Sequence, residues 1–89
     1  MMEKQSGFMR LLIYLYDHGE KQITEILDDT DIPVHQLYAS IEKGKELRLI
    51  DSRIDREKYP ARNIILLTEK GKRAAGKLRE FLIVVEQRI

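Results

Sequence analysis

The residues best suited to chemistry in this chain are cations gathered in one stretch, 53–73. That stretch has seven basic residues against three acidic ones, a surplus of four. The basic residues are Arg53, Arg56, Lys58, Arg62, Lys70, Lys72 and Arg73. Such a surplus suits contacts with phosphate groups and a salt-sensitive affinity. It therefore indicates a polyanion such as nucleic acid as the partner, and the alternative is that it is only a well-solvated charged hairpin.

The net charge of the whole chain hides an uneven distribution of charge between its two halves. The formal net charge is +1. Residues 1–50 have six Lys and Arg against nine Asp and Glu, which gives −3, whereas residues 51–89 have ten against six, which gives +4. We therefore expect a polyanion to meet mainly the C-terminal half of the chain.

Other kinds of chemistry find little support in the residues. The chain has no cysteine, which excludes disulfides and thiolate-ligated zinc. Its two histidines, His18 and His35, fall in different predicted helices and lack the spacing of a metal-binding pair. Neither a glycine-rich phosphate loop nor a constellation of serine, histidine and acid is visible. We therefore expect no metal, no cofactor and no enzymatic activity.

Two helices are predicted ahead of the region that would meet a partner. Apolar residues at three- and four-residue steps predict a helix over residues 6–18, which Ser6 can cap and Gly19 is placed to end. A brief extended piece at residues 21–23 follows. Thr24 is then a suitable N-cap for a short helix over residues 25–29.

A third helix is predicted from Pro33, whose fixed φ suits a first helical turn. Leu37 and Ile41 lie four residues apart, so both face inward. Gly44, also on this helix, is expected to pack closely against another helix. The outward residues of the first two turns are Val34, His35, Gln36, Tyr38 and Ala39. On a helix in a major groove they would reach base edges, and Gln36 could pair with adenine.

A β-hairpin and a last helix complete the prediction. Residues 49–55 alternate apolar and polar side chains, residues 56–60 form a charged tip that ends in Pro60, and residues 63–68 return as a β-branched strand. Thr68 is placed to cap a helix that begins at Glu69. The hairpin would present the basic stretch to the partner.

The end of the last helix is unusually apolar for an exposed surface. A small monomer would not normally leave such a surface uncovered. The residues concerned are Leu78, Phe81, Leu82, Ile83, Val84, Val85 and Ile89. We expect them to form a homodimer interface, and the alternative is that they cover the first helix within one chain.

The length of 89 residues predicts a single domain over residues 1–89, with residues 69–89 as the dimerisation element. No run of about 18 apolar residues is present, so no membrane span is expected. The N-terminus lacks the cleavage site of a signal peptide, which makes a cytoplasmic location the expectation. Because so little chain remains, a ligand pocket is expected only at the dimer interface, and an effector stays unknown.

Two segments resemble the winged helix-turn-helix transcriptional regulators of the broad MarR and PadR neighbourhood. IPVHQLYASIEKGKELRLI (residues 32–50) looks like their recognition helix leading into the first wing strand. LLTEKGKRAA (residues 66–75) resembles the segment that ends their wing and begins the next helix. The resemblance implies a mainly α fold with a small β-hairpin: a three-helix core, a two-stranded wing and a C-terminal helix.

The resemblance also implies a DNA-binding transcriptional regulator that acts on double-stranded DNA as a homodimer. The major-groove helix would be residues 33–46. The wing would be residues 51–67, with Arg56, Lys58 and Arg62 as phosphate or minor-groove contacts.

The chain departs from the family pattern at three points. Arg48 stands where a Gly is frequent, Gly44 stands where a large apolar residue is frequent, and the first two turns of the recognition helix lack an Arg. The alternative is a winged-helix protein–protein interaction module without DNA binding, which would use residues 24–31 or the apolar C-terminal end.

Overall fold

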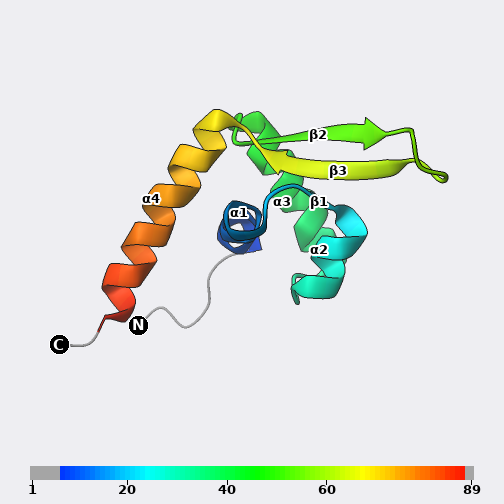
Figure 1. Cartoon of the computed structure of the whole chain (residues 1–89). Helices are drawn as coiled ribbons and strands as arrows, with labels where there is room; N and C mark the ends of the chain where they lie inside the picture. The colour runs from blue at the N-terminus through cyan, green and yellow to red at the C-terminus, as the bar shows by residue number, and fades with distance from the viewer. Residues whose placement is uncertain (1–6, 88–89) are drawn as a thin grey trace.

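Four helices pack beside a small antiparallel sheet in the computed structural model, which describes residues 7–87 (Figure 1). The elements are α1 (Gly7–His18), β1 (Lys21–Gln22), α2 (Ile23–Asp29), α3 (Val34–Glu46), β2 (Ile50–Asp55), β3 (Arg62–Leu67) and α4 (Glu69–Glu86). This order confirms the predicted mainly α fold with a hairpin wing. The predicted cap at Ser6 lies outside the described residues.

The sheet has three strands in the order β1-β3-β2. β2 and β3 pair antiparallel from Ile50 opposite Leu67 to Asp55 opposite Arg62, and the loop between them forms the tip of the wing. β1 pairs with the other edge of β3 through Lys21 opposite Ile65. The brief extended piece expected before α2 is therefore a third strand, which covers one edge of the hairpin.

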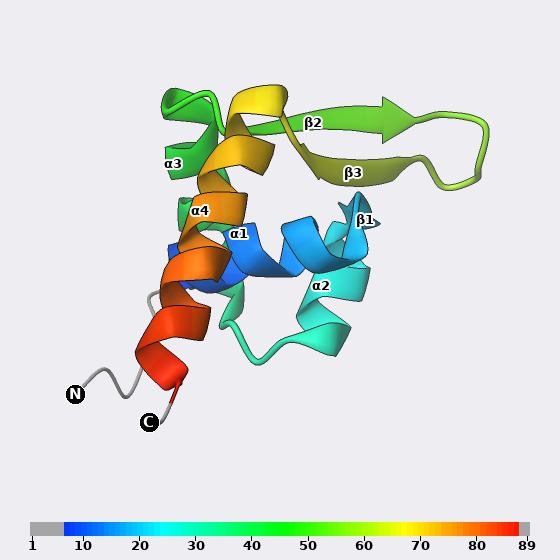
Figure 2. The ribbon, with the colours of Figure 1, turned by 60° about the vertical axis from the view of Figure 1, so that its left-hand side comes forward.

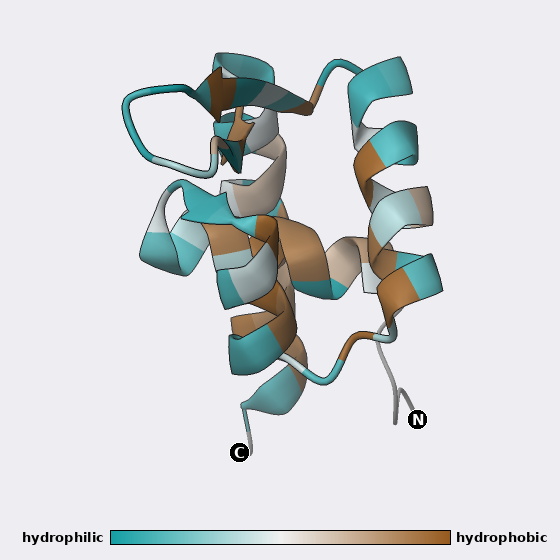
Figure 3. Ribbon diagram, turned by 90° about the vertical axis from the view of Figure 1, so that its right-hand side faces the viewer, coloured by the Kyte–Doolittle hydropathy of each residue, from teal (hydrophilic) through white to brown (hydrophobic). Residues whose placement is uncertain are grey.

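The hydrophobic core lies where α1, α2 and α3 meet the sheet. Leu11, Ile26, Leu37 and Ile65 are its largest fully buried side chains. Figure 3 shows hydrophobic segments gathered on the inner sides of these elements, while the loop of the wing is mainly hydrophilic. Leu37 and Ile41 face inward as predicted, at 0% and 4% exposed. The wing therefore projects from a core that is complete without its tip.

Two expectations about the helices were wrong in detail. The N-cap of α2 is Gln22, not Thr24, and the Gln22 backbone N–H donates to the Glu25 carboxylate at 2.9 Å. Gly44 packs against a strand instead of a helix, because a Cβ added there would lie 2.7 Å from Ile50 Cγ1 on β2. Both differences arise from β1 and β2, which bring chain segments close to the helix ends.

None of the helices within residues 7–87 combines the length and apolar character needed to cross a membrane.

The first turn of α4 is bonded to the turn between α3 and β2. The Thr68 hydroxyl accepts the Gly71 backbone N–H at 2.9 Å and donates to the Arg48 carbonyl at 2.7 Å. The Thr68 backbone N–H donates to the Leu49 carbonyl at 3.0 Å. Thr68 is therefore the N-cap of α4, as predicted. Its hydrogen bonds also fix α4, α3 and the start of the wing relative to one another.

Arg48 adopts a left-handed backbone, with φ of 61°, directly after Leu47, the C-cap of α3. Because its Cβ makes this conformation costly, Arg48→Gly is expected to raise the free energy of unfolding by about 0.5–1 kcal/mol. Chemical denaturation measures the change. Arg48→Ala is the control, since it removes the same exposed side chain and keeps the Cβ. Equal free energies of unfolding for Arg48→Gly and Arg48→Ala would contradict the proposed backbone strain at Arg48.

Candidate nucleic-acid interface

The exposed side of α3 and the wing diverge from one corner of the molecule. α3 ends at Glu46, and β2 begins at Ile50 after a short turn. Figures 1 and 2 show the wing running outward from this corner, past α2, with its tip clear of the helices. The arrangement offers a partner two elements, a helix face and a projecting hairpin.

All five predicted groove-facing residues of α3 are exposed: Val34, His35, Gln36, Tyr38 and Ala39. Val34 is 54% and Tyr38 50% exposed, whereas the opposite face of the helix lines the core. Gln36 lies at the edge of this face beside α1, because a Cβ added to Gly7 would lie 3.0 Å from Gln36 Oε1. The face therefore presents His35, Tyr38 and Ala39 outward, with Gln36 at one flank.

Two acidic residues on the same face were missing from the predicted site. His35, Ala39, Glu42 and Glu46 are spaced four, three and four residues apart, so they form one stripe along α3. All four are exposed. The spacing was visible in the sequence and could have revealed this stripe. Because Glu42 and Glu46 would repel phosphates, this stripe suits close contact with a nucleic acid only at its N-terminal end, at His35 and Ala39.

In the structure, only some of the cations of the basic stretch are available to a partner. Four of its seven basic side chains are engaged: Arg53 with Glu20, Arg62 with Gln22, Lys70 with the Leu47 carbonyl and Lys72 with Glu69. Arg56, Lys58 and Arg73 are exposed and have no ion-pair partner within residues 7–87. Arg56 and Lys58 both belong to the loop at the tip of the wing, so the tip has the free positive charge that a phosphate contact needs.

Arg62 differs from the other two predicted wing contacts. It is half-buried at the start of β3, next to the loop of the wing, and its Nη1 donates to Gln22 Oε1 at 2.9 Å. Its Nε is buried without a hydrogen-bond partner within residues 7–87. In this structure Arg62 therefore holds β1 against β3, and a contact between Arg62 and nucleic acid stays a prediction.

The end of α4 exposes the apolar surface on which the dimer prediction depends. Phe81, Ile83, Val84 and Val85 are between 49% and 65% exposed. Leu82, which was included in the predicted interface, is only 5% exposed and is already covered by its own chain. Leu78 is half-buried, and Ile89 lies outside the described residues. One chain thus covers the Leu82 side of α4 and leaves the neighbouring apolar residues uncovered.

An acidic cleft of about 560 Å³ separates α1 from the end of α2. The Tyr14 hydroxyl donates to Asp29 Oδ2 at 2.6 Å, and burial, followed by this carboxylate, raises the pKa of Tyr14. Arg10 pairs with Asp31. Four carboxylates and a single arginine line the cleft, so this side of the molecule is unsuited to a polyanion. The cleft includes Asp17, Asp28, Asp29 and Asp31.

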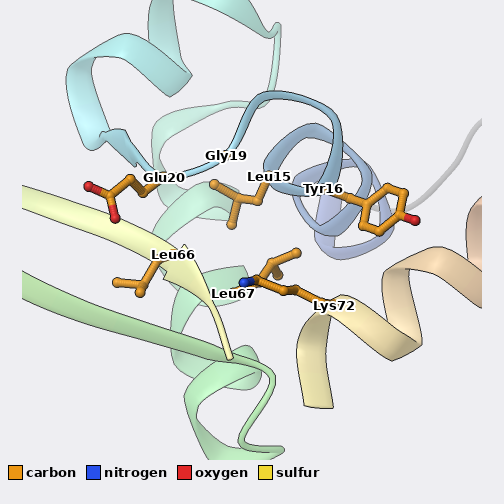
Figure 4. Close-up of a pocket in the computed structure, with 7 residues that line it drawn as sticks. All are labelled: Leu15, Tyr16, Gly19, Glu20, Leu66, Leu67 and Lys72. Carbon is orange, nitrogen blue, oxygen red and sulfur yellow. The ribbon is translucent and has the colours of Figure 1, made fainter. Parts of the chain in front are cut away.

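A smaller cavity of about 260 Å³ lies between α1, β3 and α4. Figure 4 shows Leu15 and Tyr16 on one side, Leu66 and Leu67 on the strand, and Lys72 reaching toward them from α4. One chain forms this cavity. Its volume is below the range of about 300–1,000 Å³ typical of small-molecule sites. It therefore assigns no effector.

A three-helix core with a helix-turn-helix pair and a β-hairpin beside it defines a winged helix-turn-helix protein. No family model matches the chain, and no curated protein sequence does. Solved structures do match. A protein from Archaeoglobus fulgidus has a TM-score of 0.80 at 18% identity, over 98% of this chain and 96% of that one.

Two further similar structures are those of transcriptional regulators. The reduced form of the regulator YodB from B. subtilis has a TM-score of 0.75 at 21% identity, over 91% of this chain and 79% of that one. A transcriptional regulator homologue from Pyrococcus horikoshii has a TM-score of 0.73 at 14% identity, over 90% and 83%. At these identities the likeness establishes the fold, and it confirms the resemblance to winged helix-turn-helix regulators.

Proposed function

We propose that this protein is a homodimeric transcriptional regulator that binds double-stranded DNA. The N-terminal half of α3 enters the major groove, where His35, Gln36 and Tyr38 meet base edges or phosphates. The wing lies along the backbone or in the adjacent minor groove, and Arg56 and Lys58 contact phosphates there. The fold shared with transcriptional regulators supports this assignment.

The observation that carries the proposal is the pair of unpartnered cations at the end of a projecting hairpin. Arg56 and Lys58 are exposed at the tip, whereas most other cations of the basic stretch are engaged within the chain. A side chain that has no partner in the free protein breaks no ion pair within the protein when it meets a phosphate. The wing therefore supplies most of the binding affinity for DNA, and α3 supplies shape complementarity to the major groove.

The proposal is tested by titrating the wild-type protein with a labelled duplex at low and raised salt. If each protomer of a dimer makes two phosphate contacts, affinity should fall about 100-fold between roughly 50 mM and 200 mM salt. Fluorescence anisotropy gives both dissociation constants. An absence of binding at low salt would reject the proposal, and would favour a protein–protein interaction module in its place.

The dimer is proposed to form through the exposed apolar residues at the end of α4. An interface there would bury Phe81, Val84 and Val85, and it would explain why they are uncovered in one chain. A two-fold axis between the protomers would place two recognition helices about 34–36 Å apart, one turn of duplex DNA. The operator would then have two half-sites.

Val84→Asp is expected to weaken the dimer by about 100-fold or more, because an unpaired carboxylate would be buried in an apolar interface. Analytical ultracentrifugation measures the mass as a function of concentration. Ile54→Asp is the matched control, since Ile54 on the wing is 54% exposed and Val84 is 65% exposed. The control should leave the mass unchanged. A wild-type mass of one chain at micromolar concentration would contradict the dimer.

A further inference from the structure

Tyr59 is the most exposed large hydrophobic side chain within residues 7–87. It is 99% exposed, whereas the next most exposed, Val84, is 65% exposed. An aromatic ring typically buries a large area on folding, and its apolar face is unfavourable in water. Tyr59 packs against nothing, so the core does not explain why an aromatic ring stands there.

The surroundings of Tyr59 are those of a surface that meets phosphates. It lies in the loop at the tip of the wing, beside Lys58 and three residues after Arg56. One carboxylate, Glu57, belongs to this loop, and its backbone N–H donates to Oδ1 of Asp55 at the end of β2, at 3.1 Å. Tyr59 thus follows Arg56 and Lys58 in the loop that forms the tip of the wing, and this loop lies clear of the helices (Figure 2).

We infer that Tyr59 is a wedge that stacks on a base at a partly unstacked step of duplex DNA. The inference rests on the proposed function and adds to it a residue that selects sequence through the deformability of the duplex. Apolar side chains inserted from the minor groove partly unstack base steps, and stacking on an aromatic ring is favourable for every base. Arg56 and Lys58 would hold the neighbouring phosphates while the ring enters.

This role determines which sequences the wing prefers. Steps in which a pyrimidine precedes a purine, TA above all, are the most easily unstacked. The wing should therefore favour a duplex rich in TA steps over one built from G·C pairs. The preference comes from the energy of deforming the duplex, so it requires no hydrogen bond from Tyr59 to a base edge.

The test compares Tyr59→Ala, Tyr59→Phe and Arg56→Ala on duplexes of alternating A·T and alternating G·C sequence. Tyr59→Ala should weaken binding to the A·T duplex about tenfold at every salt concentration, with an unchanged salt dependence. Tyr59→Phe keeps the ring and should bind like the wild type. Arg56→Ala removes one phosphate contact from each protomer of the dimer, so it should instead reduce the slope of log affinity against log salt by about 1.8.

The preference of the wild type for the A·T duplex should also shrink in Tyr59→Ala. Because the side chain is 99% exposed, these variants should fold like the wild type, which circular dichroism checks. Equal affinity of Tyr59→Ala and the wild type would overturn the inference while the proposed function stood. An equal loss in Tyr59→Phe would overturn it too, since the hydroxyl would then be responsible. Failure of the wild type to bind any duplex would overturn both.

Discussion

Gly71→Ala is expected to lower the free energy of unfolding by about 3 kcal/mol. A Cβ at this position would lie 2.9 Å from the Leu49 carbonyl carbon and closer still to its oxygen. The obstacle is backbone that already accepts the Thr68 N–H at 3.0 Å, so it cannot turn aside as a flexible side chain would. The first turn of α4 would have to move away from the turn between α3 and β2.

Gly76→Ala is the matched control for this prediction. Gly76 lies on the same helix, and a Cβ there would meet only the end of the Tyr16 side chain, at 3.3 Å from the hydroxyl. Ala is a better helix former than Gly by about 1 kcal/mol, so Gly76→Ala should leave the protein as stable or more stable. Thermal unfolding should show a fall of roughly 15 °C for Gly71→Ala only. Equal behaviour of the two variants would contradict the close contact.

Reversing both wing-tip charges, in Arg56→Glu with Lys58→Glu, is expected to weaken duplex binding by about 100-fold or more at low salt. The change removes two phosphate contacts from each protomer and puts carboxylates in their place, which repel the backbone. Both side chains are exposed and make no ion pair within residues 7–87, so the fold should be unaffected. Fluorescence anisotropy with a labelled duplex measures the loss.

The control variant is Lys72→Glu with Lys77→Glu, which changes the net charge by the same amount on α4. Lys72 and Lys77 each make an ion pair three residues away on the helix surface, at 3.3 and 3.8 Å, and such pairs contribute little to stability. This variant should lose much less affinity than the wing variant. A loss as large as that of the wing variant would show that net charge, and not the wing tip, governs binding.

Local sequence patterns were sufficient to predict the order of the elements. The four-residue step from Leu37 to Ile41 placed the inner face of α3, and Thr68 before Glu69 marked the start of α4. These are short-range signals, because the spacing of apolar residues and the chemistry of a cap act within one turn of chain. β1 was missed as a strand of the sheet because two residues are too few to show alternation.

The state of each cation could not be predicted from the sequence, because it depends on contacts between distant segments. Arg53 pairs with Glu20, 33 residues away, and Arg62 donates to Gln22, 40 residues away. The sequence shows only that these residues are basic. The structure separates them from Arg56 and Lys58, which are left free at the tip.

The most direct test of DNA binding through the wing is to titrate an unlabelled duplex into the ¹⁵N-labelled protein and follow the backbone amide signals by NMR. We predict that the largest shifts occur in two segments, residues 56–61 at the wing tip and residues 34–39 at the start of α3. The amide signals of the acidic segment at residues 28–31 should not shift, except at its C-terminal end, which lies next to α3. Shifts confined to residues 28–31 or to the end of α4, with the wing tip unmoved, would contradict the account.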